Sequence, residues 1–233
     1  MPIDIRILTY LFWGQFIQRY RIKKIKKQLD VDQIIYTLNE CFIRNTTSLE
    51  DDFNKQTYTV FDLETTGFFP GLGDEILSLG AVKVENRKIL HDQTFYKVLS
   101  PLSKVSHFSK QLTGLTEHDF NNGSTFPEVI TEFFRWNQNA TLVAHPANFD
   151  VPFLEKSMKK WGLPTNGIPC FVDSLTLANS HFPNQQNTLD ELIKRFKVTT
   201  RKRHHALNDA ITTAEIYVQL LNQEQIHGGK SYG

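Results

Sequence analysis

The chain has 233 residues, of which 40% are hydrophobic and 12% aromatic, and this is enough to build one large domain with a packed core. Its formal net charge is +1, so the overall charge identifies no class of partner, and a nucleic-acid enzyme would need local basic patches. Cys41 and Cys170 form no CxxC pair, which favours a reduced, cytoplasmic setting without thiolate-bound zinc. The apolar run at residues 7–17 is too short to span a bilayer, so no transmembrane segment is expected.

Residues 1–50 differ in character from the rest of the chain. Apolar residues recur at helical spacing over 5–16 and 31–42, and the segment 16–27 between them is basic and contains no acid. We therefore expect a helical, partly basic N-terminal extension, followed by a polar linker at 45–55. Three roles stay open for the extension: a solvated helix packed on the main domain, an arm that follows phosphates, or a surface that meets a partner or anionic lipid.

From residue 57 the pattern is mixed α/β. Strands are predicted at 57–63, 75–84, 88–98 and 141–144, with a loop at 71–74 and a hairpin turn at 85–87. Helices are predicted at 126–136, 148–161, 188–196 and 206–221. Three consecutive strands followed by alternating helices and strands indicate a mixed sheet flanked by helices.

The segment 60–67, VFDLETTG, carries two acids inside an apolar strand. Because side chains at i and i+2 point to the same face of a strand, Asp62 and Glu64 project together. Two anions this close repel each other and resist burial unless a cation lies between them. The segment therefore predicts a divalent metal site, although a strand end with two solvated acids would give the same pattern.

Two later acids fit the first pair. Asp150 follows the strand 141–144 at the start of a helix, and Asp209 lies in the first turn of the last long helix, after the run Arg203-His204-His205. Each has a simpler explanation when taken alone. Asp150 could complement a helix N-terminus, and Asp209 could be an exposed helical acid.

Taken in order, these segments resemble the DEDD-type 3′→5′ exonucleases, in particular the His-containing branch that includes the proofreading epsilon subunit of bacterial DNA polymerase III. The matching segments are 62–67, 74–82, 112–116, 145–150, 172–175, 188–192 and 204–209. The resemblance implies an α/β, RNase H-like fold, with a mixed five-stranded sheet and helices on both faces. We accordingly place an N-terminal extension at 1–50, the exonuclease domain at 56–224 and a flexible tail at 225–233.

The resemblance also implies the site. Asp62, Glu64, Asp150 and Asp209 would bind two Mg²⁺ or Mn²⁺ ions, and His204 would take the proton of the attacking water. Residues next to the terminal nucleotide would be Thr65, Thr66 and Gly67, which would offer backbone N–H groups to its sugar. Bases would stack against Phe149 and one of Phe68 and Phe69, although core packing would explain these aromatics equally well.

Two positions need separate comment. Spacing on a helix favours His205 as the base, since it lies at i–4 from Asp209, whereas the family pattern has four residues between the two and selects His204. His205 would then face solvent or a phosphate. Pro146 stands where the family usually has Asn, which removes an amide and a backbone N–H beside Asp150, and Asn148 is a candidate replacement.

The sequence therefore predicts a metal-dependent 3′→5′ exonuclease that releases nucleoside 5′-monophosphates from DNA 3′ ends. Single-stranded DNA is the favoured substrate, in proofreading, repair or turnover, with a polymerase or repair protein as a candidate partner. One alternative is an exoribonuclease that trims RNA or oligonucleotides, and another is a non-catalytic nucleic-acid-binding subunit, which the complete set of acids disfavours. Because the chain ends soon after its last helix, we expect a free-standing enzyme.

Overall fold

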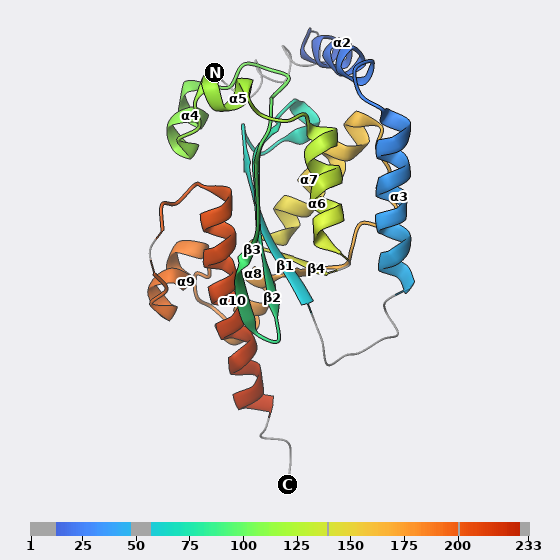
Figure 1. Ribbon diagram of the computed structural model, residues 1–233. Helices are drawn as coiled ribbons and strands as arrows, with labels where there is room; N and C mark the ends of the chain where they lie inside the picture. Colours follow the sequence, from blue (N-terminus) through green and yellow to red (C-terminus); the bar gives the residue numbers. More distant parts are fainter. Residues whose placement is uncertain (1–12, 48–56, 139, 200, 229–233) are drawn as a thin grey trace.

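The computed structural model describes residues 13–47, 57–138, 140–199 and 201–228 (Figure 1). Its centre is a mixed five-stranded sheet in the order β3-β2-β1-β4-β5. The strands are β1 (Thr57–Thr65), β2 (Ile76–Glu85), β3 (Lys88–Val98), β4 (Thr141–Ala144) and β5 (Phe171–Asp173). β1 pairs with β2 and β2 with β3 in antiparallel fashion, whereas β4 runs parallel to β1 and β5 parallel to β4. The predicted mixed five-stranded sheet is confirmed.

The β2–β3 hairpin turns through two residues, which lie within the turn predicted at 85–87. Asn86 and Arg87 have φ of 50° and 61°. Two-residue hairpin loops with positive φ at both positions are of the type that matches the twist of the flanking strands. The turn thereby fixes the pairing of β2 with β3, and the pairing of β2 with β1 places Gly80 opposite Asp62.

One face of the sheet is covered by α6 (Phe126–Asn137) and α7 (Ala147–Trp161), with α3 (Val31–Thr47) packed outside α6 (Figure 1). Phe61 and Leu63 point to this face, because they alternate with the residues of the opposite face along β1. They pack into the largest core of the protein together with Phe133 of α6 and Leu154 of α7.

The opposite face is covered by α10 (Ala206–Gly228). Tyr217 and Ala214 of this helix pack on Val60, Val82 and Val143 of three neighbouring strands. The strand alternation that points Val60 towards α10 also points Asp62 and Glu64 to that side. Two shorter helices, α8 (Ser174–His181) and α9 (Leu189–Phe196), pack against the flank of α10.

The described part of the N-terminal region contains two helices, α2 (Gln15–Lys26) and α3. α2 is attached to the sheet domain by Gln18, whose Nε2 lies 3.0 Å from the Gly73 carbonyl and 3.2 Å from Ser103 Oγ. α3 continues to Thr47, into the segment for which we predict a linker, and its Phe42 stacks edge-on against Phe134. Residues 1–12 and 48–56, which hold the rest of the predicted extension and linker, lie outside the described residues.

Among the described residues, four helical segments were not predicted: α8 and three others, η3 (Pro70–Leu72), α4 (His107–Thr113) and α5 (Glu117–Asn121). α4 ends at Gly114, whose φ of 76° is left-handed, and α5 begins with a capping box between Thr116 and Asp119. α10 starts at Ala206 as expected but continues past residue 221 to Gly228, and residues 229–233 of the predicted tail lie outside the described residues. In the described part of the chain, no helix is long and apolar enough to cross a membrane.

Candidate active site

The five side chains to which the sequence assigns catalysis line one cleft. The cleft has a volume of about 610 Å³, and its walls include Asp62, Glu64, Asp150, His204 and Asp209. They come from the end of β1, the first turn of α7, the loop before α10 and the first turn of α10. The fold thus brings together residues that are separated by almost 150 positions in the chain, as 209 minus 62 is 147.

Asp150 is positioned by a cap shared between two helices. Asp173, at the end of β5, accepts hydrogen bonds from the Leu175 N–H at 3.0 Å and from the Ala147 N–H at 3.3 Å. The first bond caps α8, and the second holds the start of α7 beside the sheet. Asp150 therefore enters the cleft from a helix whose first residue is fixed. Asn148 is exposed beside it, and the His145–Pro146 peptide is cis.

The carboxylates share one electrostatic environment. Burial raises the pKa of Asp62 well above its usual value, and the charges of Asp150, Glu64 and Asp209 raise it further. Burial and the charge of Asp209 raise the pKa of Glu64 to about 7. Burial and Glu64 raise the pKa of Asp150, although a hydrogen bond from the Leu63 backbone opposes the shift. Anions gathered at such a site favour the binding of a cation.

The donor set fits a divalent metal ion. One ligand atom from each of Glu64, His204 and Asp209 lies within 4.8 Å of the others, and these residues could hold a metal ion. Asp62 and Asp150 face the same cleft and add two further carboxylates.

His204 lies on the loop immediately before α10, with a left-handed φ of 57°. Its backbone N–H donates to Asp209 Oδ2 at 2.9 Å, and its side chain is exposed to the cleft. His205 occupies a different environment, because its ring is half-buried and stacks on Tyr96 with 4.6 Å between centroids. His205 was expected to face solvent or a phosphate, but its ring packs against Tyr96 instead.

Arg203 is the member of the site that the sequence reasoning missed. Its guanidinium pairs with Asp209 Oδ1 through Nη1, and its Nε lies 2.8 Å from Asp190 Oδ1. The positive charge of Arg203 lowers the pKa of Asp62 and of Glu64 and so opposes the effect of burial. Its position directly before His204, in the basic run 201–203, was the only signal in the sequence.

Phe149 lies at the edge of the cleft, where the sequence predicts a base-stacking residue. Its ring contacts that of Phe68 edge-on at 5.7 Å, and Phe68 is 74% exposed. In contrast, Thr65, Thr66 and Gly67 do not lie among the residues that line the cleft. The Thr66 N–H already donates to the Glu75 carbonyl at 2.9 Å, so this amide is engaged within the fold.

His145 adds a buried hydrogen-bonded chain to the wall of the cleft. Its Nδ1 lies 2.9 Å from Ser174 Oγ, and that hydroxyl donates to the Ala144 carbonyl at 2.8 Å. Because the hydroxyl proton is used in the second bond, Nδ1 of His145 acts as the donor in the first. Burial lowers the pKa of this imidazole, which favours its neutral form. His145 thus links the end of β4 to the start of α8.

Residues 59–217 match the exonuclease family (RNase_T). The chain belongs to this exonuclease family. A DNA polymerase III of the PolC type from Caldanaerobacter subterraneus subsp. tengcongensis is 38% identical over 185 residues, which are 79% of this chain and 12% of that protein. The DNA polymerase III subunit epsilon of Rickettsia typhi is 31% identical over 171 residues, which are 71% of this chain and 74% of that protein. The exonuclease chain thus spans only a small part of the PolC-type relatives it matches.

Two solved nuclease structures have a similar fold. The nuclease domain of 3′hExo, described as a DEDDh family member bound to rAMP, has a TM-score of 0.66 at 20% identity and covers 74% of this chain and 94% of its own. Exonuclease X in complex with 5′ overhanging duplex DNA has a TM-score of 0.57 at 21% identity and covers 72% of this chain and 93% of its own. These structures establish the fold, and the predicted RNase H-like exonuclease fold is confirmed.

Proposed function

We propose that the chain hydrolyses DNA from the 3′ end with the help of two divalent cations and releases nucleoside 5′-monophosphates. The observation that carries this proposal is the meeting of four carboxylates and one exposed imidazole at a single open cleft. DNA is favoured over RNA because one relative above is named as a DNA polymerase III and the other as a subunit of DNA polymerase III. The same names support a replicative or repair setting and a polymerase as a partner.

Asp62, Glu64, Asp150 and Asp209 would hold the two cations. When bound, Mg²⁺ or Mn²⁺ ions lower the pKa of an attacking water and offset the charge that develops on the leaving 3′ oxygen. Burial, and after it the charge of Asp209, raises the pKa of Glu64 to about 7, so a nearby cation would favour the ionised form of this carboxylate. The protein thus supplies a site in which bound cations would offset the negative charge of the four carboxylates.

His204 would act as the general base. An imidazole can accept a proton near neutral pH, and the loop position of His204 leaves its side chain free of the helix. Asp209 holds the His204 backbone through Oδ2, so one carboxylate both faces the cations and orients the base. Phe149 and Phe68 would contact the terminal bases from the rim of the cleft, where every base offers a face for stacking.

The deciding experiment follows the products from 5′-labelled single-stranded DNA, duplex DNA, mismatched-end DNA and RNA, with Mg²⁺ or with EDTA. Asp62→Asn and Asp209→Asn should abolish hydrolysis while the fold is retained. Asp92→Asn, an exposed acid on β3, is the matched control and should remain active. Hydrolysis that survives EDTA, or product that is released from the 5′ end, would refute the proposal, and faster cleavage of RNA than of DNA would select the exoribonuclease alternative.

A further inference from the structure

A second groove lies between α2 and the C-terminal half of α7. Its volume is about 490 Å³, and its walls carry Arg19 from α2 and Lys156, Lys159 and Lys160 from α7. No acidic residue is among those that line it. α2 precedes the region that matches the exonuclease family, so this groove joins the family fold to a segment outside the match.

Two of the four basic side chains that line the groove are not offset by a neighbouring acid among the described residues. Lys159 forms an ion pair with Glu155, and Lys160 is half-buried near Glu75 and Asp74. Arg19 and Lys156 are both exposed, and neither forms an ion pair within the described part of the chain. They belong to opposite walls, so an anion in the groove could be contacted from both sides.

The walls of the groove are fixed by the fold. Gln18 of α2 hydrogen-bonds to the Gly73 carbonyl and to Ser103, and Arg21 donates to the Leu102 carbonyl. Pro70 and Gly71 of η3 form part of the groove lining, and a Cβ on Gly71 would meet no heavy atom within 4 Å. The groove therefore has a preformed shape and an open side at Gly71, where a bulky chain can approach the backbone.

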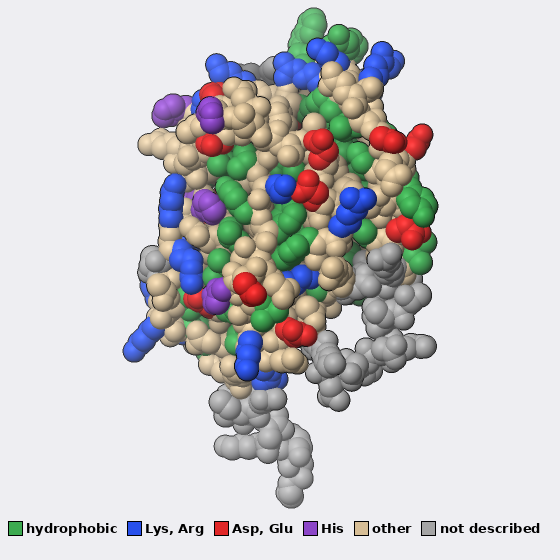
Figure 2. Space-filling view, in the orientation of Figure 1, with side chains coloured by type: hydrophobic (Ala, Val, Ile, Leu, Met, Phe, Trp, Pro, Cys, Tyr) green, Lys and Arg blue, Asp and Glu red, His purple; other side chains and the backbone are tan. Residues whose placement is uncertain are grey.

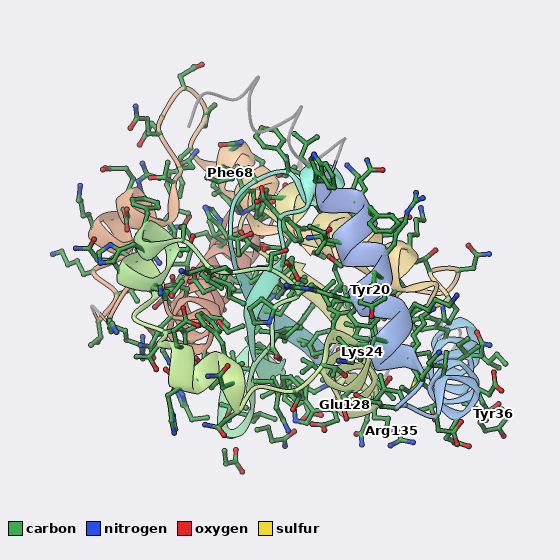
Figure 3. The ribbon with its side chains drawn as sticks, turned by 90° about the horizontal axis from the view of Figure 1, so that it is seen from above. Tyr20, Lys24, Tyr36, Phe68, Glu128 and Arg135 are labelled. Carbon is green, nitrogen blue, oxygen red and sulfur yellow. The ribbon has the colours of Figure 1, made fainter. Side chains whose placement is uncertain are left out.

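The groove is related to the active-site cleft through the loop that carries Phe68 and along α7. Phe68 contacts Phe149, which lines that cleft, and the groove begins two residues beyond Phe68, at Pro70. Along α7, the seven residues from Phe149 to Lys156 correspond to about 10 Å at 1.5 Å per residue. This is the length of about three nucleotides in a stacked strand. In the view from above, Phe68 lies on the loop beside the N-terminal end of α2, and Tyr20 and Lys24 follow along that helix (Figure 3).

We propose that the α2–α7 groove binds phosphates of the substrate strand, about three nucleotides and more upstream of its 3′ end. This inference rests on the proposed function, because it requires a strand whose end lies at the acids. Hydrophobic and basic side chains lie side by side at the top of the molecule, over α2 (Figure 2). A flat lipid surface would meet the exposed Phe16 and Tyr20 first, whereas a single strand can enter the groove and reach cations on both walls.

The test compares two double variants with equal loss of charge. Arg19→Gln with Lys156→Gln removes the free cations of the groove. Lys24→Gln with Lys27→Gln removes two exposed cations, one on α2 and one at its C-cap, that do not line the groove. Binding of a labelled single strand of about 20 nucleotides is measured by fluorescence anisotropy in EDTA at several salt concentrations. We expect the groove variant to bind about tenfold more weakly, with a salt slope smaller by about 1.4, and the control to bind like the wild type.

Cleavage of a strand of about 3 nucleotides in Mg²⁺ separates this inference from the proposed function, because so short a strand does not reach the groove. All three proteins should cleave it at similar rates. If none of them cleaves it, the proposed function fails. If all cleave it but the groove variant and the wild type have the same salt slope, the groove inference is overturned. It is also overturned if the control loses as much affinity for the strand as the groove variant does. Loss of binding to phosphatidylserine vesicles by the groove variant would change neither conclusion.

Discussion

A Cβ atom on Gly80 would lie 2.1 Å from the backbone nitrogen of Leu207, so β2 and the first turn of α10 touch backbone to backbone. Gly80 is paired with Asp62 across the β1–β2 ladder. The same close approach therefore sets the distance from Asp62 and Glu64 of β1 to Asp209 of α10. Only glycine leaves room for it, because a contact this short with backbone atoms cannot be relieved by a rotamer change.

Gly80→Ala should move the start of α10 away from the sheet and separate Asp209 and His204 from Glu64. Because a displacement of about 1 Å can cost about 100-fold in rate, we expect a loss of that order, with about 1–3 kcal/mol of stability lost to overpacking. Single-turnover cleavage and urea unfolding measure the two effects. Gly71→Ala, assayed on a strand of about 3 nucleotides that does not reach the groove, is the matched control, since its Cβ would meet open space. Normal activity in Gly80→Ala would show that the site does not depend on this contact.

His204→Ala should lower the turnover rate by about 100-fold or more while strand binding persists, because only the proton acceptor is lost. His205→Ala should keep most of its turnover but lower the free energy of unfolding by about 0.5–1.5 kcal/mol, because the stacking on Tyr96 disappears. Single-turnover cleavage across the pH range from about 6 to 9 and thermal unfolding distinguish the two variants. If His205→Ala were the inactive variant, the assignment of the base would be wrong by one residue.

Arg203→Ala should lower the free energy of unfolding of the metal-free protein and increase the stabilisation that Mg²⁺ provides. The guanidinium is paired with Asp209 and lowers the pKa of Asp62 and Glu64, so its removal leaves the acids with less compensation. We expect a loss on the order of 2 kcal/mol in EDTA and a larger rise in Tm on adding Mg²⁺ than the wild type shows. Arg201→Ala, which breaks the ion pair with Glu215, is the control. An equal rise in Tm for wild type and Arg203→Ala would contradict this role.

Because Lys83 is buried, the free energy of unfolding should depend on pH independently of the active site. Its ammonium is buried 4.8 Å from the Trp136 ring centroid and donates to the Asn137 carbonyl, and burial lowers its pKa from 10.5 to about 8. Between these values the unfolded chain binds more protons than the folded one, so stability rises with pH from about 8 towards 10.5. Below about pH 8, the destabilisation caused by burying the Lys83 ammonium is fully present.

The expected gain from Lys83 across this window is on the order of 2 kcal/mol. Urea unfolding at a series of pH values in EDTA should show the rise in the wild type and its absence in Lys83→Met. Lys88→Met, an exposed lysine on the same hairpin, should leave the rise unchanged. Parallel pH profiles for the wild type and Lys83→Met would mean that the ammonium is not desolvated in solution.

The shared face of Asp62 and Glu64 could be predicted because its signal is local, whereas Asp150 and Asp209 were assigned through the family resemblance. Asp62 and Glu64 share a face through the two-residue period of a strand, and the structure shows that face directed at α10, as Val60 packs there. The helix start at Ala206 and the turn at Asn86 were predicted for the same reason, since each depends on a few neighbouring residues. The roles of the individual acids and of His204 stay predictions until they are measured.

Other features depend on contacts that no short window of sequence contains. The pairing of Arg203 with Asp209 and Asp190 requires α9, α10 and the loop between them to be in place. The groove requires Arg19 and Lys156 to meet across segments that are remote in the chain. By contrast, the capping residues of α4 and α5, Ser106 and Thr116, are signals that a short window of sequence does contain.

The attachment of α3 has a practical consequence. Leu38 and Phe42 of this helix are buried in the same core as Phe61 and Phe134, although the family match begins only at residue 59. The matched region is therefore smaller than the unit that folds, and a protein trimmed to it would carry an open apolar seam where α3 had been. Aggregation is the first property to examine in such a trimmed preparation, since a loss of activity there would say nothing about the chemistry.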